Sequence, residues 1–310
     1  MKKWLGISLV VAFLAGAAFA QVSPDTQALR VYDKNHPPFS CNGSCIINYN
    51  GGPVVEKAPT VYIVWYGAWK KKDKSIIDYY FQHLGGTTQM KINTTFSDST
   101  NTFIPNAVNH TSKNDYHDNY SLGKSIGDGQ IQLIVANAIK NKHLPNDTNG
   151  VYFVLTYKDV SDSGFCSQFC GYHSPSTGIV KNEIIRYSMV GDPGQCPSGC
   201  STPVVVGDHG KGGSPNMDPD ADGTVAIMWH EFSETVSDPE VNLKTAWAGN
   251  SCGESGDCCA WLFGTEKKDG NGNIYTNTIG TKNYVMQMMF ELTSKSRSGN
   301  VPGECENIFQ

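Results

Sequence analysis

The sequence predicts a single α+β domain. We expect a mixed sheet backed by one helix, a second helix that carries the active-site residues, and loops closed by disulfides. Three observations predict this class. Short β-branched and aromatic runs alternate with segments of helical apolar spacing. One helix combines an apolar stripe with a row of ionisable residues. The ten cysteines are an even number, as in disulfide-bonded secreted proteins.

The first 20 residues are predicted to be a secretory signal peptide. They contain a basic start (Lys2 and Lys3), an apolar run and a small-x-small cleavage site that ends at Ala20. The run is short for a membrane span, and no other stretch of the sequence is long enough for one. Cleavage would leave 290 residues and change the formal net charge from −5 to −7. An acidic chain without a basic block excludes nucleic acid as a partner.

The first elements of the mature chain follow in order. Residues 21–50 are polar and are predicted to be irregular. Residues 60–66 (TVYIVWY) are β-branched and aromatic, which predicts a buried strand. Residues 73–84 have apolar side chains at helical spacing, and the glycine pair at 85–86 ends the predicted helix.

The middle of the chain continues this alternation. Residues 89–96 are predicted to form a strand. Residues 97–123 are rich in Asn, Ser and Thr and are predicted to be a loop. A second helix is predicted over residues 129–140, from its apolar spacing, and a buried strand over residues 150–156.

Loops dominate the following part. Residues 164–174 are predicted to be a cysteine-rich loop, residues 183–190 a strand, and residues 191–222 a long loop rich in Gly, Pro and Asp. Residues 269–273 (DGNGN) predict a hairpin turn. A last strand is expected over residues 284–290.

The cysteines fall into three C-x-x-x-C pairs and four further positions. A secreted chain favours disulfides over zinc–thiolate sites, and the sequence does not determine the pairing. The pairs are Cys41/Cys45, Cys166/Cys170 and Cys196/Cys200, and the further residues are Cys252, Cys258, Cys259 and Cys305.

The helix predicted over residues 222–238 is the most informative segment. Pro239 ends it, because proline donates no N–H and disfavours helix in the residue before it. Asp222 and Gly223 occupy the predicted N-cap. An apolar stripe forms along one side of this helix, made of Val225, Met228, Trp229, Phe232 and Val236.

Ionisable residues gather on the opposite side of this helix. His230, Glu234 and Asp238 are spaced by four, and Glu231 lies beside them. His230-Glu231-x-x-Glu234 resembles the H-E-x-x-H motif of zincins, in which two ligands one turn apart bind zinc and the Glu is the general base. We therefore expect a zincin-like domain in which His230 and Glu234 bind Zn²⁺ and Glu231 is catalytic. The rival interpretation is an amphipathic helix with a solvated polar face.

A hydrolytic zinc site needs a third protein ligand and an open position for water. Glu254 is favoured, because it follows the helix much as the third ligand does in thermolysin-like zincins. Asp238 is the other candidate, although a straight helix carries it away from His230. His173 offers a further ligand or substrate contact, but a hydrogen-bonded loop histidine is the better interpretation. A His/Glu/Glu site acidifies water less than a His-rich one, which counts against fast hydrolysis.

The acids before the helix have two interpretations. Asp218-x-Asp220-x-Asp222-Gly223 resembles the start of a calcium-binding loop. The bidentate acid that such a loop needs at its end is missing, since Trp229 stands there. Capping of the helix explains these acids better.

Several segments in one order resemble the Exordium, or phosphate-induced protein, family of secreted proteins. They are Gly51-Gly52-Pro53 with TVYIVWYG, VYFVLTYKDV with GFCSQFCGYH, VGDPGQCPSGC, DGTVAIMWHEFSETVSDP, Cys259-Ala260-Trp261 and the closing Cys305. We therefore divide the chain into a signal peptide (1–20), an irregular segment (21–50) and an Exordium-like domain (51–310). The resemblance implies an extracellular, cell-wall-associated protein linked to growth, and it implies no particular reaction.

Two functions fit these observations. The first is a secreted zincin-like metallohydrolase that acts on an extracellular peptide or polymer. The second is a non-catalytic protein that binds cell-wall polysaccharide or a protein partner. A glycosidase is disfavoured, because Glu231 and Glu234 share one helix and cannot face each other across a sugar. The expected location is outside the cell, or the periplasm in a bacterial host, and the oligomeric state is not predicted.

The second function depends on aromatic side chains that would stack on sugars. Residues of this kind also fill protein cores, which is the alternative explanation for them. The candidates are Trp65, Tyr66, Trp69, Trp247 and Trp261.

Overall fold

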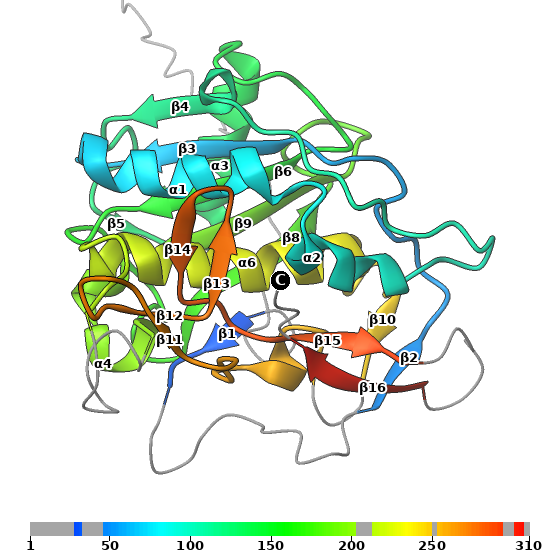
Figure 1. Ribbon diagram of the computed structural model, residues 1–310. Helices are drawn as coiled ribbons and strands as arrows, with labels where there is room; N and C mark the ends of the chain where they lie inside the picture. The colour runs from blue at the N-terminus through cyan, green and yellow to red at the C-terminus, as the bar shows by residue number, and fades with distance from the viewer. Residues whose placement is uncertain (1–27, 33–45, 203–212, 250–252, 294–300, 307–310) are drawn as a thin grey trace, which may run out of the picture.

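The computed structural model describes residues 28–32, 46–202, 213–249, 253–293 and 301–306 (Figure 1). The predicted signal peptide, and Cys41, Cys45 and Cys252, lie outside these residues. None of the helices in the described part of the chain has the length and apolar character that a membrane span needs.

A six-stranded mixed sheet forms the centre of the described structure, in the order β1-β8-β9-β6-β3-β4. The four parallel strands are β3 (Val61–Tyr66), β4 (Asp115–Asp118), β6 (Val151–Thr156) and β9 (Ile185–Gly191). The antiparallel strand β8 (Phe169–Ser176) follows β9, and β1 (Ala28–Arg30) pairs antiparallel with β8 at the edge. The predicted α+β class with a mixed sheet is confirmed.

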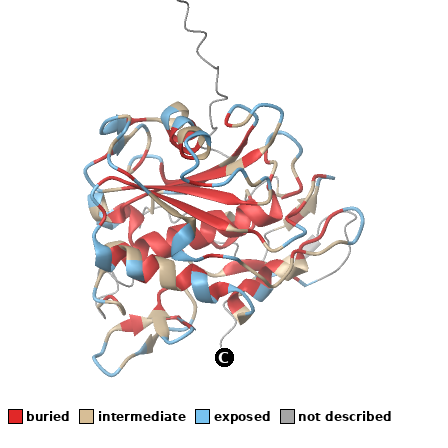
Figure 2. Cartoon of the chain, turned by 90° about the horizontal axis from the view of Figure 1, so that it is seen from above, coloured by how far each residue is buried: buried red, intermediate tan, exposed pale blue. Residues whose placement is uncertain are grey.

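The parallel strands form where the sequence is β-branched and aromatic. Every residue of β3 and β6 is buried, and Figure 2 shows this burial along the central strands. A parallel sheet is covered on both faces, which explains why its strands are continuous apolar runs rather than alternating ones. The predicted strands at 60–66, 150–156 and 183–190 are confirmed.

Three long helices cover the two faces of this sheet. They are α1 (Lys71–Leu84), α3 (Asp128–Lys140) and α6 (Pro219–Ser237). Phe81 of α1 contacts both Phe153 of β6 and Phe232 of α6, which places α1 and α6 side by side on one face (Figure 1). The helices predicted over 73–84 and 129–140 are confirmed.

Alternation along β8 separates the two faces of the sheet. The hydroxyl of Tyr172 donates to Asp128 at the start of α3. Gly171, its neighbour, lies against α6, because a Cβ at Gly171 would come 2.8 Å from Ile227. Successive residues of a strand point to opposite faces, so His173 is directed to the same side as Gly171. The α6 face therefore receives a histidine from β8.

A smaller four-stranded sheet, three strand pairs and several short helices complete the described structure. The sheet is ordered β10-β2-β16-β15, from Trp247–Ala248, Ile46–Tyr49, Val301–Glu306 and Met289–Leu292. The pairs are β5 (Ser125–Ile126) with β7 (Ser161–Asp162), β11 (Lys267–Lys268) with β12 (Ile274–Tyr275), and β13 (Asn277–Ile279) with β14 (Lys282–Tyr284). The short helices are α2 (Thr88–Lys91), η1 (Ile92–Thr95), η2 (Ser112–Asn114), η3 (Pro193–Gln195), α4 (Pro197–Cys200) and η4 (Asp257–Cys259).

Disulfides join loops that are distant in sequence, as predicted for this chain. The bonds are Cys166–Cys196, Cys170–Cys200 and Cys259–Cys305. Two of the C-x-x-x-C pairs are thus bonded to each other rather than within themselves. The first bond joins the segment before β8 to the N-cap of α4, and the second joins β8 itself to α4, so both hold the strand that carries His173.

Two predicted strands differ in the structure. Residues 89–96 form α2 and η1, because the side chain of Thr87 accepts the N–H of Met90 and starts a helical turn. The strand expected over 284–290 is divided between β14 and β15. Its middle residues leave both sheets, where Met286 N donates to the Thr276 hydroxyl and Trp229 Nε1 donates to Gln287 O.

Other segments predicted to be irregular contain regular structure. Residues 21–50 include β1 and β2, and residues 97–123 include β4. The cysteine-rich loop at 164–174 contains most of β8, and the loop at 191–222 contains η3, α4 and the start of α6. These segments are polar and lack apolar periodicity, so the sequence did not predict regular structure in them. The strands among them form because they pair with strands that are distant in sequence. The hairpin turn at 269–273 is confirmed by β11 and β12.

Candidate metal centre

Helix α6 begins three residues earlier than the sequence predicted. Asp218 is the N-cap, its carboxylate accepts the N–H of Ala221, and proline follows at the first helical position. Asp222, the predicted cap, lies inside the helix and accepts bonds from the Ser214 hydroxyl and from Asn216 N. The interpretation of these acids as helix caps is therefore correct for Asp218 and wrong for Asp222.

Helix α6 is buried on every side. All residues from Ala221 to Ser237 are buried, and His230, Glu231 and Glu234 are each 0% exposed. The amphipathic-helix interpretation, with a solvated polar face, is therefore wrong. Buried charged groups are costly unless they are paired or bind a cation, so this face needs a partner.

The acids of α6 meet His173 of β8 and Glu254, which follows the helix in the chain. His173 Nδ1 lies 3.5 Å from Glu231 Oε2 and 3.6 Å from Glu234 Oε2, and His173 Nε2 lies 3.7 Å from Glu254 Oε1. His230 Nε2 lies 3.1 Å from Glu234 Oε1. Glu234 thus stands between the two histidines, and each of its oxygens faces one of them.

These atoms form two overlapping sets of potential metal ligands. One set is His173, Glu234 and Glu254, and the other is His230, Glu231 and Glu234; in each, the ligand atoms lie within 4.8 Å of one another. Donors about 2.1 Å from a tetrahedral zinc ion lie about 3.4 Å apart. The separations of 3.1 and 3.6 Å between Glu234 and the two histidines are close to that spacing.

The donor atoms lack hydrogen-bond partners among the described residues. This holds for both ring nitrogens of His173, for His230 Nε2, for one oxygen each of Glu231 and Glu234, and for both carboxylate oxygens of Glu254. Buried polar atoms are nearly always hydrogen-bonded, because an unpartnered one is costly. Convergence of several such lone pairs on one place fits a divalent cation.

The protonation equilibria also indicate an excess of negative charge. Burial, and then the neighbouring Glu234, raises the pKa of Glu254 well above its usual value, and the pKa of Asp257 shifts likewise. Burial raises the pKa of Glu231 as well. Burial opposes a charge on His230, but Glu234 outweighs it and raises the His230 pKa to about 10. Glu231, Glu254 and Asp257 therefore retain protons more readily unless a cation balances them, whereas burial is outweighed at Glu234 by His230, which lowers the pKa of Glu234.

Groups around the centre hold its side chains in place. The Gln287 amide contacts His230 Nδ1 through its nitrogen at 3.0 Å and its oxygen at 3.4 Å, so it can serve either tautomer. Asp257 N donates to Glu234 Oε1, and Asp257 Oδ1 lies 3.7 Å from His230 Nε2. Gly256 is necessary here, because a Cβ would come 2.8 Å from both Glu234 Oε1 and His230 Nδ1.

The structure brings together four of the residues predicted for the site and leaves one apart. His230, Glu231, Glu234 and Glu254 lie together. Asp238 does not join either ligand set; it follows the end of α6 and accepts the Ala246 N–H at 2.8 Å. The interpretation of His173 as a hydrogen-bonded loop residue is wrong, because it lies in β8 and faces the acids. The only sequence signal for it was its place in the family segment GFCSQFCGYH.

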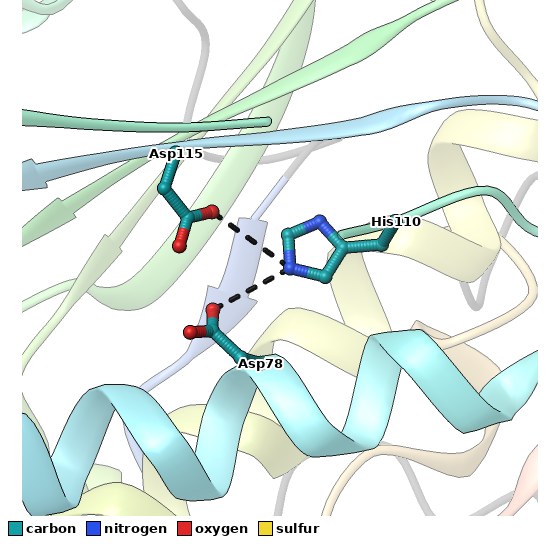
Figure 3. Close-up of side chains that lie close together, drawn as sticks. All are labelled: Asp78, His110 and Asp115. Carbon is teal, nitrogen blue, oxygen red and sulfur yellow. Dashed lines mark hydrogen bonds and ion pairs between the residues drawn. The ribbon is translucent and has the colours of Figure 1, made fainter. Parts of the chain in front are cut away.

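A second His–Asp cluster lies between α1 and β4 (Figure 3). His110 Nδ1 donates to Val61 O at 2.9 Å, and Nε2 lies 3.4 Å from Asp78 and 3.8 Å from Asp115. Burial opposes a charge on His110, but Asp78 outweighs it and raises its pKa; burial also raises the pKa of Asp115 to about 7. Here imidazolium and carboxylate balance each other, so we assign this cluster to the stability of the fold.

The aromatic residues considered for sugar binding belong to the core. None of them is more than 9% exposed, and Trp69, Trp247 and Trp261 each donate their indole N–H to a backbone carbonyl. They therefore fill the core, as the alternative explanation held, and offer no stacking surface for a sugar.

The fold and the centre define a disulfide-bonded α+β protein with a buried histidine–carboxylate site. Residues 47–292 match the family described as "Phosphate-induced protein 1 conserved region". The chain belongs to this Exordium and phosphate-induced protein family.

Curated relatives in plants cover most of the chain. EXORDIUM-like 5 of Arabidopsis thaliana is 29% identical over 82% of this chain and 77% of its own, and EXORDIUM-like 3 of the same plant is 31% identical over 75% and 73%. PHOSPHATE-INDUCED 1 of Nicotiana tabacum is 26% identical over 70% of this chain and 73% of its own. No solved structure matches the chain.

Proposed function

We propose that the protein is a metal-dependent hydrolase with a zincin-like centre that cleaves peptide bonds outside the cell. The observation that carries this proposal is the pair of buried ligand sets that share Glu234, one with His173 and Glu254 and the other with His230 and Glu231, in which most donor atoms lack a hydrogen-bond partner among the described residues. His173, His230 and Glu234 would hold Zn²⁺, and the fourth position would remain open for water. Two imidazoles in the set make it less negative than the His/Glu/Glu site expected from the motif, which removes part of the objection to hydrolysis.

The cation, when bound, would polarise the substrate carbonyl and acidify water. Glu231 is the residue suited to proton transfer. Its Oε2 is buried without a hydrogen-bond partner in the described structure, while its Oε1 accepts a backbone N–H from Leu29. A carboxylate with one free oxygen can take a proton from the attacking water, and its raised pKa favours that transfer. The carboxyl group so formed can then pass the proton to the leaving amine, which is the stronger base.

Two features support the part of the proposal that places the protein outside the cell. The disulfides of the fold fit an oxidising compartment, and the predicted signal peptide would direct the chain there. The relatives named for phosphate induction and for Exordium belong to the same family. Their names state no reaction, so the hydrolytic activity rests on the geometry of the centre alone.

Metal analysis of the purified protein tests the proposal. We expect about one equivalent of a divalent metal in the wild type and in Glu231→Gln, and little in His230→Ala. Peptide hydrolysis should fall by about 10²–10⁴-fold in Glu231→Gln, because that variant keeps the cation and loses the base. A folded wild-type protein that binds no divalent metal would rule out the hydrolase.

A further inference from the structure

The centre is closed to solvent, and β1 is the short segment that lies against its catalytic acid. His173 and Glu254 are 1% exposed, and Glu231 is fully buried. Leu29 of β1 donates its N–H to Glu231 Oε1 at 3.2 Å, and its side chain is 2% exposed. The backbone of β1 therefore occupies a place from which a peptide reaches Glu231 directly.

The strand is held at the sheet edge as an extended peptide would be. Its register places Leu29 opposite Gly171 of β8, and a bulge follows before Arg30. Arg30 O accepts the indole N–H of Trp261 at 2.9 Å, and Val31 N donates to Gln168 O. These bonds use the backbone of β1, so a different peptide could make them equally well.

The close approach of β8 to Glu231 is possible because Gly171 has no Cβ. A Cβ at Gly171 would lie 3.1 Å from Glu231 Oε1 and 2.8 Å from Ile227 Cγ2. Without a Cβ, the backbone of β8, the acid of α6 and the N–H of the added strand come together. The edge of β8 is thus shaped to bring an extended backbone to Glu231.

We propose that β1 is an internal occupant of a peptide-binding groove along β8, and that the groove takes extended polypeptides with a large aliphatic residue at the position of Leu29. That this peptide is a substrate rests on the proposed function; its binding does not. In a substrate, the nitrogen at the Leu29 position would be the leaving amine. Water would add to the preceding carbonyl carbon, the C–N bond would break, and Glu231 would pass its proton to that nitrogen.

Release of β1 and capture of a peptide test the groove. Leu29→Lys places a charge in a buried position and should expel β1, whereas Leu29→Met keeps the volume and should not. The probe is a dye-labelled synthetic peptide with the sequence of residues 26–32 (TQALRVY), followed by fluorescence anisotropy. We expect saturable binding to Leu29→Lys, and binding at least tenfold weaker to the wild type and to Leu29→Met.

Two altered peptides show whether binding uses the proposed contacts. A peptide with lysine in place of Leu29, and one with a methyl group on the Leu29 nitrogen, should each bind Leu29→Lys at least tenfold more weakly. Equal binding of all three peptides, or no binding to the folded variant, would overturn the groove. If Leu29→Lys does not fold, Leu29→Ala is tested in the same way, because it loosens β1 without adding a charge.

The same samples separate this proposal from the hydrolase. Peptide binding without metal-dependent cleavage would support the groove and contradict the proposed hydrolase. Metal-dependent cleavage of other peptides, without binding of this peptide, would support the hydrolase and contradict the groove.

Discussion

At the scale of single residues, His173 changes the chemistry of the centre most. The helix motif alone supplies one imidazole, and the strand β8 supplies the second from 57 positions earlier in the chain. Its two ring nitrogens lie 3.5 to 3.7 Å from three different glutamates. A histidine so placed adds to the site an imidazole donor that comes from outside the helix.

We expect His173→Ala to lose metal as completely as His230→Ala, because each removes one of two imidazoles from the donor set. Asp238→Asn is the matched control and should retain the metal, since Asp238 belongs to neither ligand set. Metal content by elemental analysis is the measurement. Retention of a full equivalent by His173→Ala would show that the site forms without β8.

A second prediction at this scale concerns Asp162, whose Oδ2 is buried without a hydrogen-bond partner in the described structure. Burial, with Asp128 nearby, raises the Asp162 pKa to about 7. Between pH 4 and pH 7 the folded state therefore holds a proton that the unfolded state has lost. The contribution of Asp162 to the free energy of unfolding therefore falls as the pH rises through this range.

Asp162→Asn removes the titrating group and should remove this dependence. We expect the variant to be more stable than the wild type at pH 8, by about 1–2 kcal/mol, and similar at pH 4. Urea unfolding at both pH values measures the difference. A constant difference at the two pH values would contradict the assignment.

At the scale of elements, the centre depends on how closely the segment after α6 returns to the helix. Gly256 precedes η4 and has ordinary helical backbone angles, so alanine is allowed by its backbone. The restriction is the space between Gly256 and the side chains of His230 and Glu234. The helix and the segment after it therefore act as one unit in forming the site.

Gly256→Ala should weaken metal binding at least tenfold and lower stability by about 1–3 kcal/mol, because the new methyl group must displace His230 or Glu234. Gly270→Ala is the control, since a Cβ there meets no atom within 4 Å. Metal titration and thermal unfolding of the two variants are the measurements. An affinity for metal equal to that of the wild type in Gly256→Ala would show that the segment can move away from the ligands without weakening the site.

At the scale of the whole molecule, cation binding and stability should be coupled. The centre joins α6, β8 and the segment that contains Glu254, so a bound cation would connect parts of the chain that lie apart in the sequence. A ligand that binds only the folded state stabilises it, by about 2.7 kcal/mol at 100 times its Kd.

We expect Zn²⁺ to raise the Tm of metal-depleted protein by about 5–10 °C at this excess. The increase should disappear in His230→Ala, and Mg²⁺ should give less because imidazole ligands favour zinc. Calorimetry with and without each ion is the measurement. Equal shifts in the wild type and in His230→Ala would assign the effect to another site.

The sequence by itself determined the elements whose signals are local. The strands β3, β6 and β9, the helices α1 and α3, and the pairing of His230 with Glu234 follow from periodicity and spacing within one segment. Glu254 was also found, because the family of zinc sites places an acid after such a helix. The position of β8 and β1 was not found, since strand pairing joins residues far apart in sequence.

Only the tertiary structure decided what the helix does. It buried α6 on all sides, brought His173 to Glu234, moved Asp238 out of the site and placed Leu29 on Glu231. Each of these facts depends on contacts between distant segments, and local patterns carry no information about such contacts. Burial then gives the same carboxylates a different chemistry, because a charge without solvent must find a partner in the fold.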